Sequence, residues 1–341
     1  KAHVWQQLIT KHKMDEIDFN SIPGRALQKL VKSKALSNWN LTEKYSEWIK
    51  SKSTVKFTGY VHELFRGFDS CKSISEDRIT SIERDTTNAQ FNKLIEVAKT
   101  DMNLDSAYLV AIDTSGSMHS EASGTHTTSL NVAKSIALYF SELLHGEFAD
   151  SYVVFDDDCE LEYWIGDTPC DKFMNEESEA YGSTNFLSVI SLIIEVRKRH
   201  PEIPESEFPK GVLCISDGEF NRVCRNRPGI FTDEKDLAVT NFSAAREMLK
   251  SFFSKQFVDD FKIVLWDVPN SYYSNNPKTK FEDFADCPNL FHISGYDPSV
   301  VSFLTGKSEF KASPTTSEEL FKEAMDQTLL NKVELGFMKS K

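Results

Sequence analysis

From residue 105 onward, short β-type runs alternate with helical patterns. The β-type runs are short apolar or alternating stretches, at 107–112, 152–155, 159–164, 212–215, 261–266 and 290–293. Between them, apolar residues recur every three or four positions, which predicts helices over 130–144, 186–194 and 245–253. The run at 159–164 follows its predecessor closely, so we expect these two strands to form a hairpin. The whole pattern predicts an α/β fold, a doubly wound and mostly parallel sheet covered by helices on both faces.

The preceding segment, residues 1–104, carries helical spacing only. Two long stripes of apolar side chains, at 57–65 and 91–102, recur every three or four positions. Pro23 stands where a helix could begin, and Asn40 precedes Glu43 by three residues, as in a capping box. The segment is therefore predicted to be an α-helical array, which either packs alone or ends a larger helical-repeat domain.

Charge divides the chain at the same place as the hydrophobic pattern. The 341 residues carry a net charge of −13, but residues 1–104 hold 17 Lys and Arg against 13 Asp and Glu. The excess of basic residues is concentrated in residues 1–60, where the count is 11 against 5. Such a segment can attract nucleic-acid phosphates, and it can equally be a solvated helical surface. The remaining residues carry a net charge of −17.

Several classes of protein are poor fits to this composition. The longest largely apolar stretch, 186–196, is 11 residues, whereas a membrane-spanning helix needs about 20. No apolar run follows the first residues, so we expect no signal peptide. Six cysteines without a CxxC pair do not suit a zinc ribbon or a disulfide scaffold. We therefore expect no membrane partner and an intracellular, cytoplasmic location, or association with virions if the source is viral.

Oxygen-bearing side chains follow the predicted strands at three loops. Asp113, Ser115 and Ser117 alternate directly after the first β-type run, Thr184 precedes a helix, and Asp217 follows the run at 212–215. Ligands of doubly wound sheets bind at the carboxyl edge, so these loops would converge if the two strands are neighbours. Hydroxyl and carboxylate oxygens suit Mg²⁺ or Mn²⁺. These five residues are the predicted metal site.

Other interpretations of the polar residues are possible. Asp, Ser and Thr are common helix N-caps, although capping alone does not explain why three loops carry oxygens in this order. We interpret 156–158, three consecutive aspartates, as a solvated hairpin turn, His62 as part of a helix surface and His292 as a strand residue. No phosphate-binding glycine motif is present, and no recognised pattern supplies a general base. A metal-dependent hydrolase is therefore the last-ranked hypothesis, and the chain is predicted not to be an enzyme.

The five oxygen-bearing residues resemble the metal-ion-dependent adhesion site of von Willebrand factor A domains. The resemblance covers residues 105–310 and rests on D-x-S-x-S, then Thr184, then Asp217 before a glycine. It implies that Ser115, Ser117 and Thr184 contact the ion through hydroxyls and that Asp113 and Asp217 act mostly through bound waters. It also implies that an Asp or Glu carboxylate of a protein partner completes the coordination.

A helical segment followed by such a domain resembles the Ro autoantigen (TROVE-module) proteins and a related group of viral and plant proteins. The stretches 22–27 and 56–60 carry the resemblance to that second group. The expected organisation is 1–104 helical, 105–310 von Willebrand factor A-like and 311–341 a C-terminal helix and tail. The expected function is a non-enzymatic, Mg-dependent binding module. The alternative is a Ro-like protein that binds non-coding RNA through residues 1–60 and recruits proteins through the A-like domain.

Overall fold

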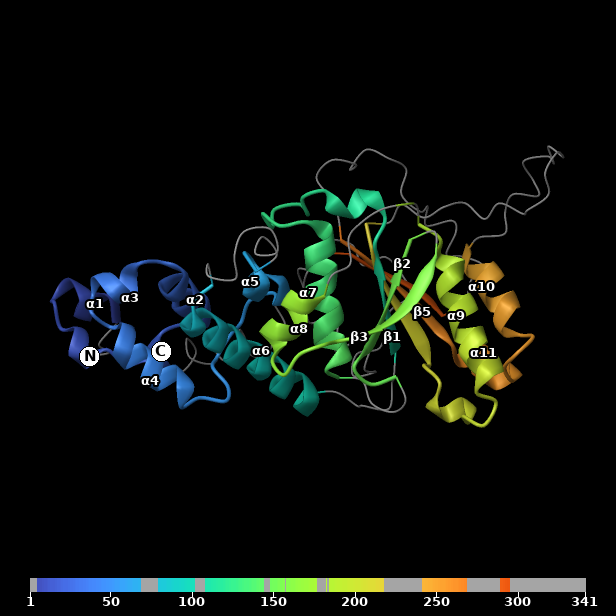
Figure 1. Cartoon of the computed structure of the whole chain (residues 1–341), viewed down its shortest axis with the longest axis horizontal. Helices are drawn as coiled ribbons and strands as arrows, with labels where there is room; N and C mark the ends of the chain where they lie inside the picture. Colours follow the sequence, from blue (N-terminus) through green and yellow to red (C-terminus); the bar gives the residue numbers. More distant parts are fainter. Residues whose placement is uncertain are drawn as a thin grey trace, which may run out of the picture.

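A computed structural model shows a helical unit beside a three-layered α/β unit (Figure 1). The structure describes residues 5–68, 79–101, 108–143, 148–156, 158–176, 182, 184–217, 241–268 and 289–294. The predicted C-terminal helix and tail, 311–341, lie outside the described residues. Within the described ranges, no helix is both long enough and apolar enough to span a membrane.

Six strands form one sheet in the order β3-β2-β1-β4-β5-β6. All neighbouring strands are parallel except β2 and β3, which form the predicted antiparallel hairpin. The strands are β1 (Tyr108–Asp113), β2 (Ser151–Phe155), β3 (Cys159–Tyr163), β4 (Gly211–Ser216), β5 (Lys262–Asp267) and β6 (Leu290–Ser294). The predicted α/β class with a mostly parallel, doubly wound sheet is confirmed.

Helices cover both faces of the sheet because successive side chains of each strand point to opposite faces (Figure 1). In β1, Val110 and Ile112 pack with the helix α7 (Ser129–Ser141), while Leu109 and Ala111 face the opposite layer. That second layer consists of α9 (Phe186–Arg199), α10 (Asn241–Leu249) and α11 (Lys255–Asp260). The central strands are buried on both sides, which explains why they read as continuous apolar runs.

The helical unit at the start of the chain has a separate core. Its helices are α1 (Trp5–Thr10), α2 (Gly24–Lys32), α3 (Ala35–Asn38) and α4 (Thr42–Lys50). Short 3-10 turns lie here at Met14–Glu16 and Phe19–Ser21, and later at Gly116–His119 and Glu205–Glu207. A Cβ on Gly24 would lie 2.2 Å from the Lys56 carbonyl oxygen, so only glycine allows α2 to approach that backbone.

The two units are joined through a shared hydrophobic core rather than a polar linker. The helices α5 (Val61–Phe65) and α6 (Ser81–Asp101) belong to the same cluster as α7 and one face of the sheet. Phe65 stacks on Phe173 of α8 (Pro169–Asn175) with ring centroids 4.5 Å apart. The packing therefore continues across the predicted boundary at residues 104 and 105.

Two local predictions for the helical segment are wrong. Helix α4 begins at Thr42 after Leu41, and Asn40 has a left-handed backbone, so the Asn40–Glu43 capping box does not form. His62 is buried rather than surface-exposed, with 6% of its area accessible, and its ring stacks on Tyr60 at 5.7 Å. Burial and, to a lesser extent, the positive charges of Arg66 and Arg25 together lower the pKa of His62 to about 4. His292 lies in β6, as predicted.

His62 makes stability sensitive to acid. Its pKa is lower in the folded protein than the ordinary 6.5, so the unfolded chain binds more protons between pH 6.5 and about 4. The stabilisation is present above pH 6.5 and is lost as the pH falls toward 4. We expect the free energy of unfolding to fall by about 2 kcal/mol between about pH 7 and pH 5 from this source.

Urea unfolding of the wild type and of His62→Gln at both pH values measures this contribution. The variant lacks the titrating ring, so its unfolding free energy should depend less on pH than that of the wild type. Equal pH dependence in the two proteins would contradict the assignment.

Candidate functional site

The carboxyl ends of β1 and β4 lie side by side at the centre of the sheet. The chain leaves β1 toward β2 and later enters β4 on the opposite side, so the strand order reverses between them. Ile112 lies opposite Ile215, which places Asp113 next to Ser216 at the edge. In open α/β sheets this switch point is where ligands bind. The two strands are thus neighbours, as convergence of the predicted site requires.

Asp113 is held by hydrogen bonds to both of its carboxylate oxygens. The backbone N–H of Ser115 donates to Oδ1 at 2.8 Å, which closes the turn after β1. The hydroxyl of Ser216, at the end of β4, donates to Oδ2 at 2.5 Å. Since Asp113 has no accessible area, these contacts fix the orientation of its carboxyl group.

Two acidic side chains are buried together at this edge. Asp217 is 1% exposed and follows β4 directly. Burial raises the pKa of Asp113, the hydrogen bonds from Ser216 and Ser115 oppose that rise, and the negative charge of Asp217 adds to it. The resulting pKa is about 7. Two buried carboxylates at close quarters favour the arrival of a positive charge or a proton.

The hydroxyl groups of the first loop lie close to one another. Ser115 is buried, Ser117 is half-buried, and their Oγ atoms are 3.2 Å apart. The backbone N–H of Gly116 donates to the Gly182 carbonyl oxygen at 3.5 Å, so this loop contacts the segment that leads to Thr184. Thr184 is 3% exposed and lies just before α9. The first loop therefore contacts the segment before Thr184, and the end of β1 contacts the end of β4.

The five predicted residues can hold a hard cation only if the serine and threonine hydroxyls act as ligands. Among the residues that the structure describes, no three or more His, Cys, Asp or Glu side chains gather closely enough to hold a metal. The two carboxylates and three hydroxyls predicted from the sequence are all oxygen donors, the kind that Mg²⁺ and Mn²⁺ prefer. Such a set would leave the ion much of its positive charge.

Sequence reasoning missed two further polar residues at this edge. Ser216 orients Asp113 across 103 residues of sequence, and Asp267 ends β5 opposite Ser216 with 7% of its area exposed. For Ser216, the signal available in the sequence was the alternation of β4, because Cys214 and Ser216 must face the same side of the sheet. Neither that alternation nor the residue spacing shows which strand is the neighbour of β4.

This fold and this edge define a doubly wound α/β protein whose polar residues gather at the switch point. The chain belongs to the family described as "Domain of unknown function (DUF7788)", whose model matches residues 108–337. A curated relative is "Uncharacterized protein L728" of Acanthamoeba polyphaga mimivirus, 22% identical over 319 residues. That match covers 90% of this chain and 50% of the relative, so the chain spans about half the relative's length.

Among solved structures, the chain is similar to the crystal structure of the Deinococcus radiodurans RO (RSR) protein. The TM-score is 0.45 and the sequence identity 12%, over 89% of this chain and 55% of that one. A Ro protein is thus among the structural neighbours of the chain.

The hydrogen bond from Ser216 to Asp113 should have a measurable energy. In Ser216→Ala, one oxygen of a buried carboxylate loses its donor, so we expect the free energy of unfolding at pH 8 to fall by about 1–3 kcal/mol. Urea unfolding of metal-free protein measures this change. The exposed Ser251→Ala, which should change stability by less than about 0.5 kcal/mol, is the control. A neutral effect of Ser216→Ala would contradict the proposed role of the hydroxyl.

Proposed function

We propose that the chain is a non-enzymatic binding module of the von Willebrand factor A type. In this proposal, Mg²⁺ or Mn²⁺ is held by hydroxyls of Ser115, Ser117 and Thr184, and Asp113 and Asp217 act mostly through water. A carboxylate from a protein partner completes the coordination. The observation that carries the proposal is the meeting of these loops at the switch point, where β1 and β4 are neighbours.

Hydrogen bonds hold the Asp113 carboxylate in one orientation, since each of its oxygens accepts one, from Ser115 and from Ser216. Each oxygen keeps a second lone pair, which in this proposal accepts a hydrogen bond from a water on the ion. The paired hydroxyls of Ser115 and Ser117 have lone pairs to offer to the ion directly. An ion held mainly by neutral hydroxyls favours an anionic ligand, and a carboxylate oxygen suits a hard cation.

The acidic charge of the α/β part favours a short-range protein contact over a nucleic acid at this edge. Residues 105–341 carry a net charge of −17, which opposes the approach of phosphates. An RNA ligand is therefore the second candidate, through the basic residues 1–60. Exposed lysines of that segment, such as Lys29, Lys34 and Lys50, support it.

The direct test uses an array of peptides that each display one Glu or Asp, beside matched peptides with Gln or Asn. In millimolar Mg²⁺ we expect the full chain to bind a subset of the acidic peptides, at least about tenfold more tightly than the matched amides. EDTA should abolish that binding, and so should Thr184→Ala, which removes one hydroxyl. The exposed Ser191→Ala in α9 is the control and should bind as the wild type does.

Equal binding in EDTA, or no preference for carboxylates over amides, would contradict the proposal. An electrophoretic shift with RNA, run on the same full chain, tests the second candidate. Truncation at residue 105 is unsuitable because α5 and α6 share their core with the sheet. A triple Lys→Glu variant at positions 29, 34 and 50 should reduce any RNA shift, while Thr184→Ala should leave it unchanged.

A further inference from the structure

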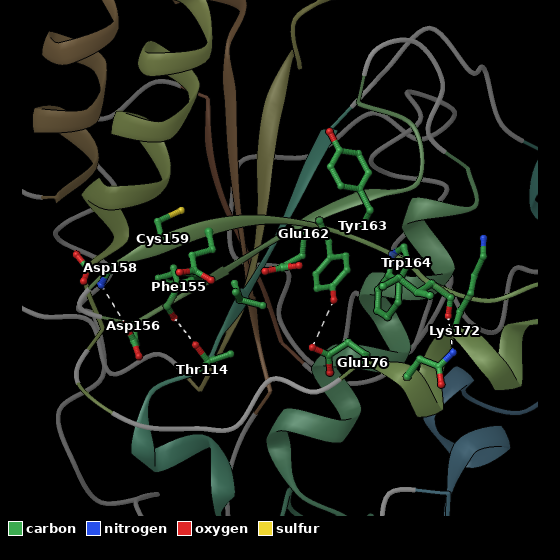
Figure 2. Close-up of a pocket in the computed structure, with 15 residues that line it drawn as sticks. Thr114, Phe155, Asp156, Asp158, Cys159, Glu162, Tyr163, Trp164, Lys172 and Glu176 are labelled. Carbon is green, nitrogen blue, oxygen red and sulfur yellow. Dashed lines mark hydrogen bonds between the residues drawn. The ribbon is translucent and has the colours of Figure 1, made fainter. Parts of the chain in front are cut away.

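A cavity of about 780 Å³ opens between the β2–β3 hairpin and α8 (Figure 2). Thr114, the residue after Asp113, forms part of its wall and bonds to the Phe155 carbonyl oxygen through its backbone N–H and its hydroxyl. The cavity therefore lies beside the edge described above, but it is built from different side chains. No part of the proposed metal chemistry uses it.

Most of the carboxylates in this cavity have no ion-pair partner among the residues that the structure describes. Of its five carboxylates, Glu176 is paired with the buried Lys134, and the one lining lysine, Lys172, is paired with Glu142 and Asp150. The other four form no ion pair within the part of the chain that the structure describes, and they are Asp156, Asp158, Glu160 and Glu162. The lining thus offers four negative charges to a ligand.

Aromatic rings stand beside these carboxylates. Tyr152 and Trp164 are stacked, with centroids 4.1 Å apart and planes 26° from parallel, and both line the cavity. Ile165, just after β3, also lines the cavity and is 69% exposed. Rings attract cations over their faces, and exposed apolar side chains cover the aliphatic stem of a long basic residue.

The spacing of the carboxylates selects an organic cation over a metal ion. Glu160 and Glu162 lie two apart on β3, whereas Asp156 and Asp158 flank the hairpin turn. No three acidic side chains of the described chain come close enough to share one metal ion. A guanidinium is planar, has five donors and stacks on rings, so it can meet separated carboxylates and an aromatic wall together.

The position of β3 favours a ligand carried on an extended chain. Among the strands that the structure describes, β3 is the outermost, with β2 as its one neighbour, so an extended segment of a partner could pair along its other side. We infer that the cavity binds an arginine side chain presented by an extended segment of a protein partner. Beside Thr114, that arginine would lie next to a carboxylate bound at the metal. This juxtaposition rests on the proposed function, whereas binding of arginine in the cavity does not.

The test uses the full chain and a fluorescent peptide containing two arginines separated by glycine, with citrulline and lysine versions as comparisons. Fluorescence anisotropy should show the arginine peptide binding more tightly than the lysine peptide, and the citrulline peptide not binding. The variant Glu160→Gln/Glu162→Gln should weaken binding by about tenfold, the size of a lost charge-assisted contact.

The matched control is Glu43→Gln/Glu47→Gln, which removes the same two charges from the exposed face of α4. If binding depends on the carboxylates of the cavity, this control should change the affinity by less than about twofold. If binding reflects net charge alone, the control should weaken it as much as the cavity variant does. Equal losses in both double variants would overturn the inference, and so would spermidine binding as tightly as the arginine peptide. Binding should persist in EDTA, so failure of the metal proposal and failure of this one are distinguishable.

Discussion

The parallel pairing of β1 with β4 is the constraint on which the rest of the site depends. It places Asp113 against Ser216 and directs two loops to the same edge. The pairing is itself secured by burial, since Val110 and Ile112 pack on one face and Leu109 and Ala111 on the other. A shift of register by one residue would exchange the two faces and separate the serine from the carboxylate.

The same constraint explains the unusual electrostatics of the edge. Strands that end together bring their terminal polar groups together, and here two of those groups are carboxylates with almost no accessible area. Their burial is costly unless donors or a cation compensate. Hydrogen bonds compensate part of the cost at Asp113, and the proposed cation would compensate the remainder. The cavity beside Thr114 has its own negative charge on β3, which gives a partner two kinds of contact.

Local patterns predicted the elements, but not the contacts between distant ones. The buried strands β1 and β4 and the hairpin were predictable because their apolar runs are short and bounded by polar turns. His62 was misassigned because its burial depends on packing between α5 and α7, and the role of Ser216 depends on a neighbour 103 residues away. In the sequence, the carboxylates of the cavity resemble ordinary turn and strand residues, because only the fold places the hairpin beside α8. That the five oxygen-bearing residues of the predicted site hold an ion stays a prediction.

The most direct test of the central claim is a titration of the full chain with Mn²⁺, followed by electron paramagnetic resonance. We predict one bound Mn²⁺ per chain, displaced by excess Mg²⁺. Asp217→Asn and Thr184→Ala should each lose that ion, whereas Asp167→Asn, an exposed acidic residue away from the edge, should retain it. No bound Mn²⁺ in the wild type, or equal binding in all three variants, would contradict the account.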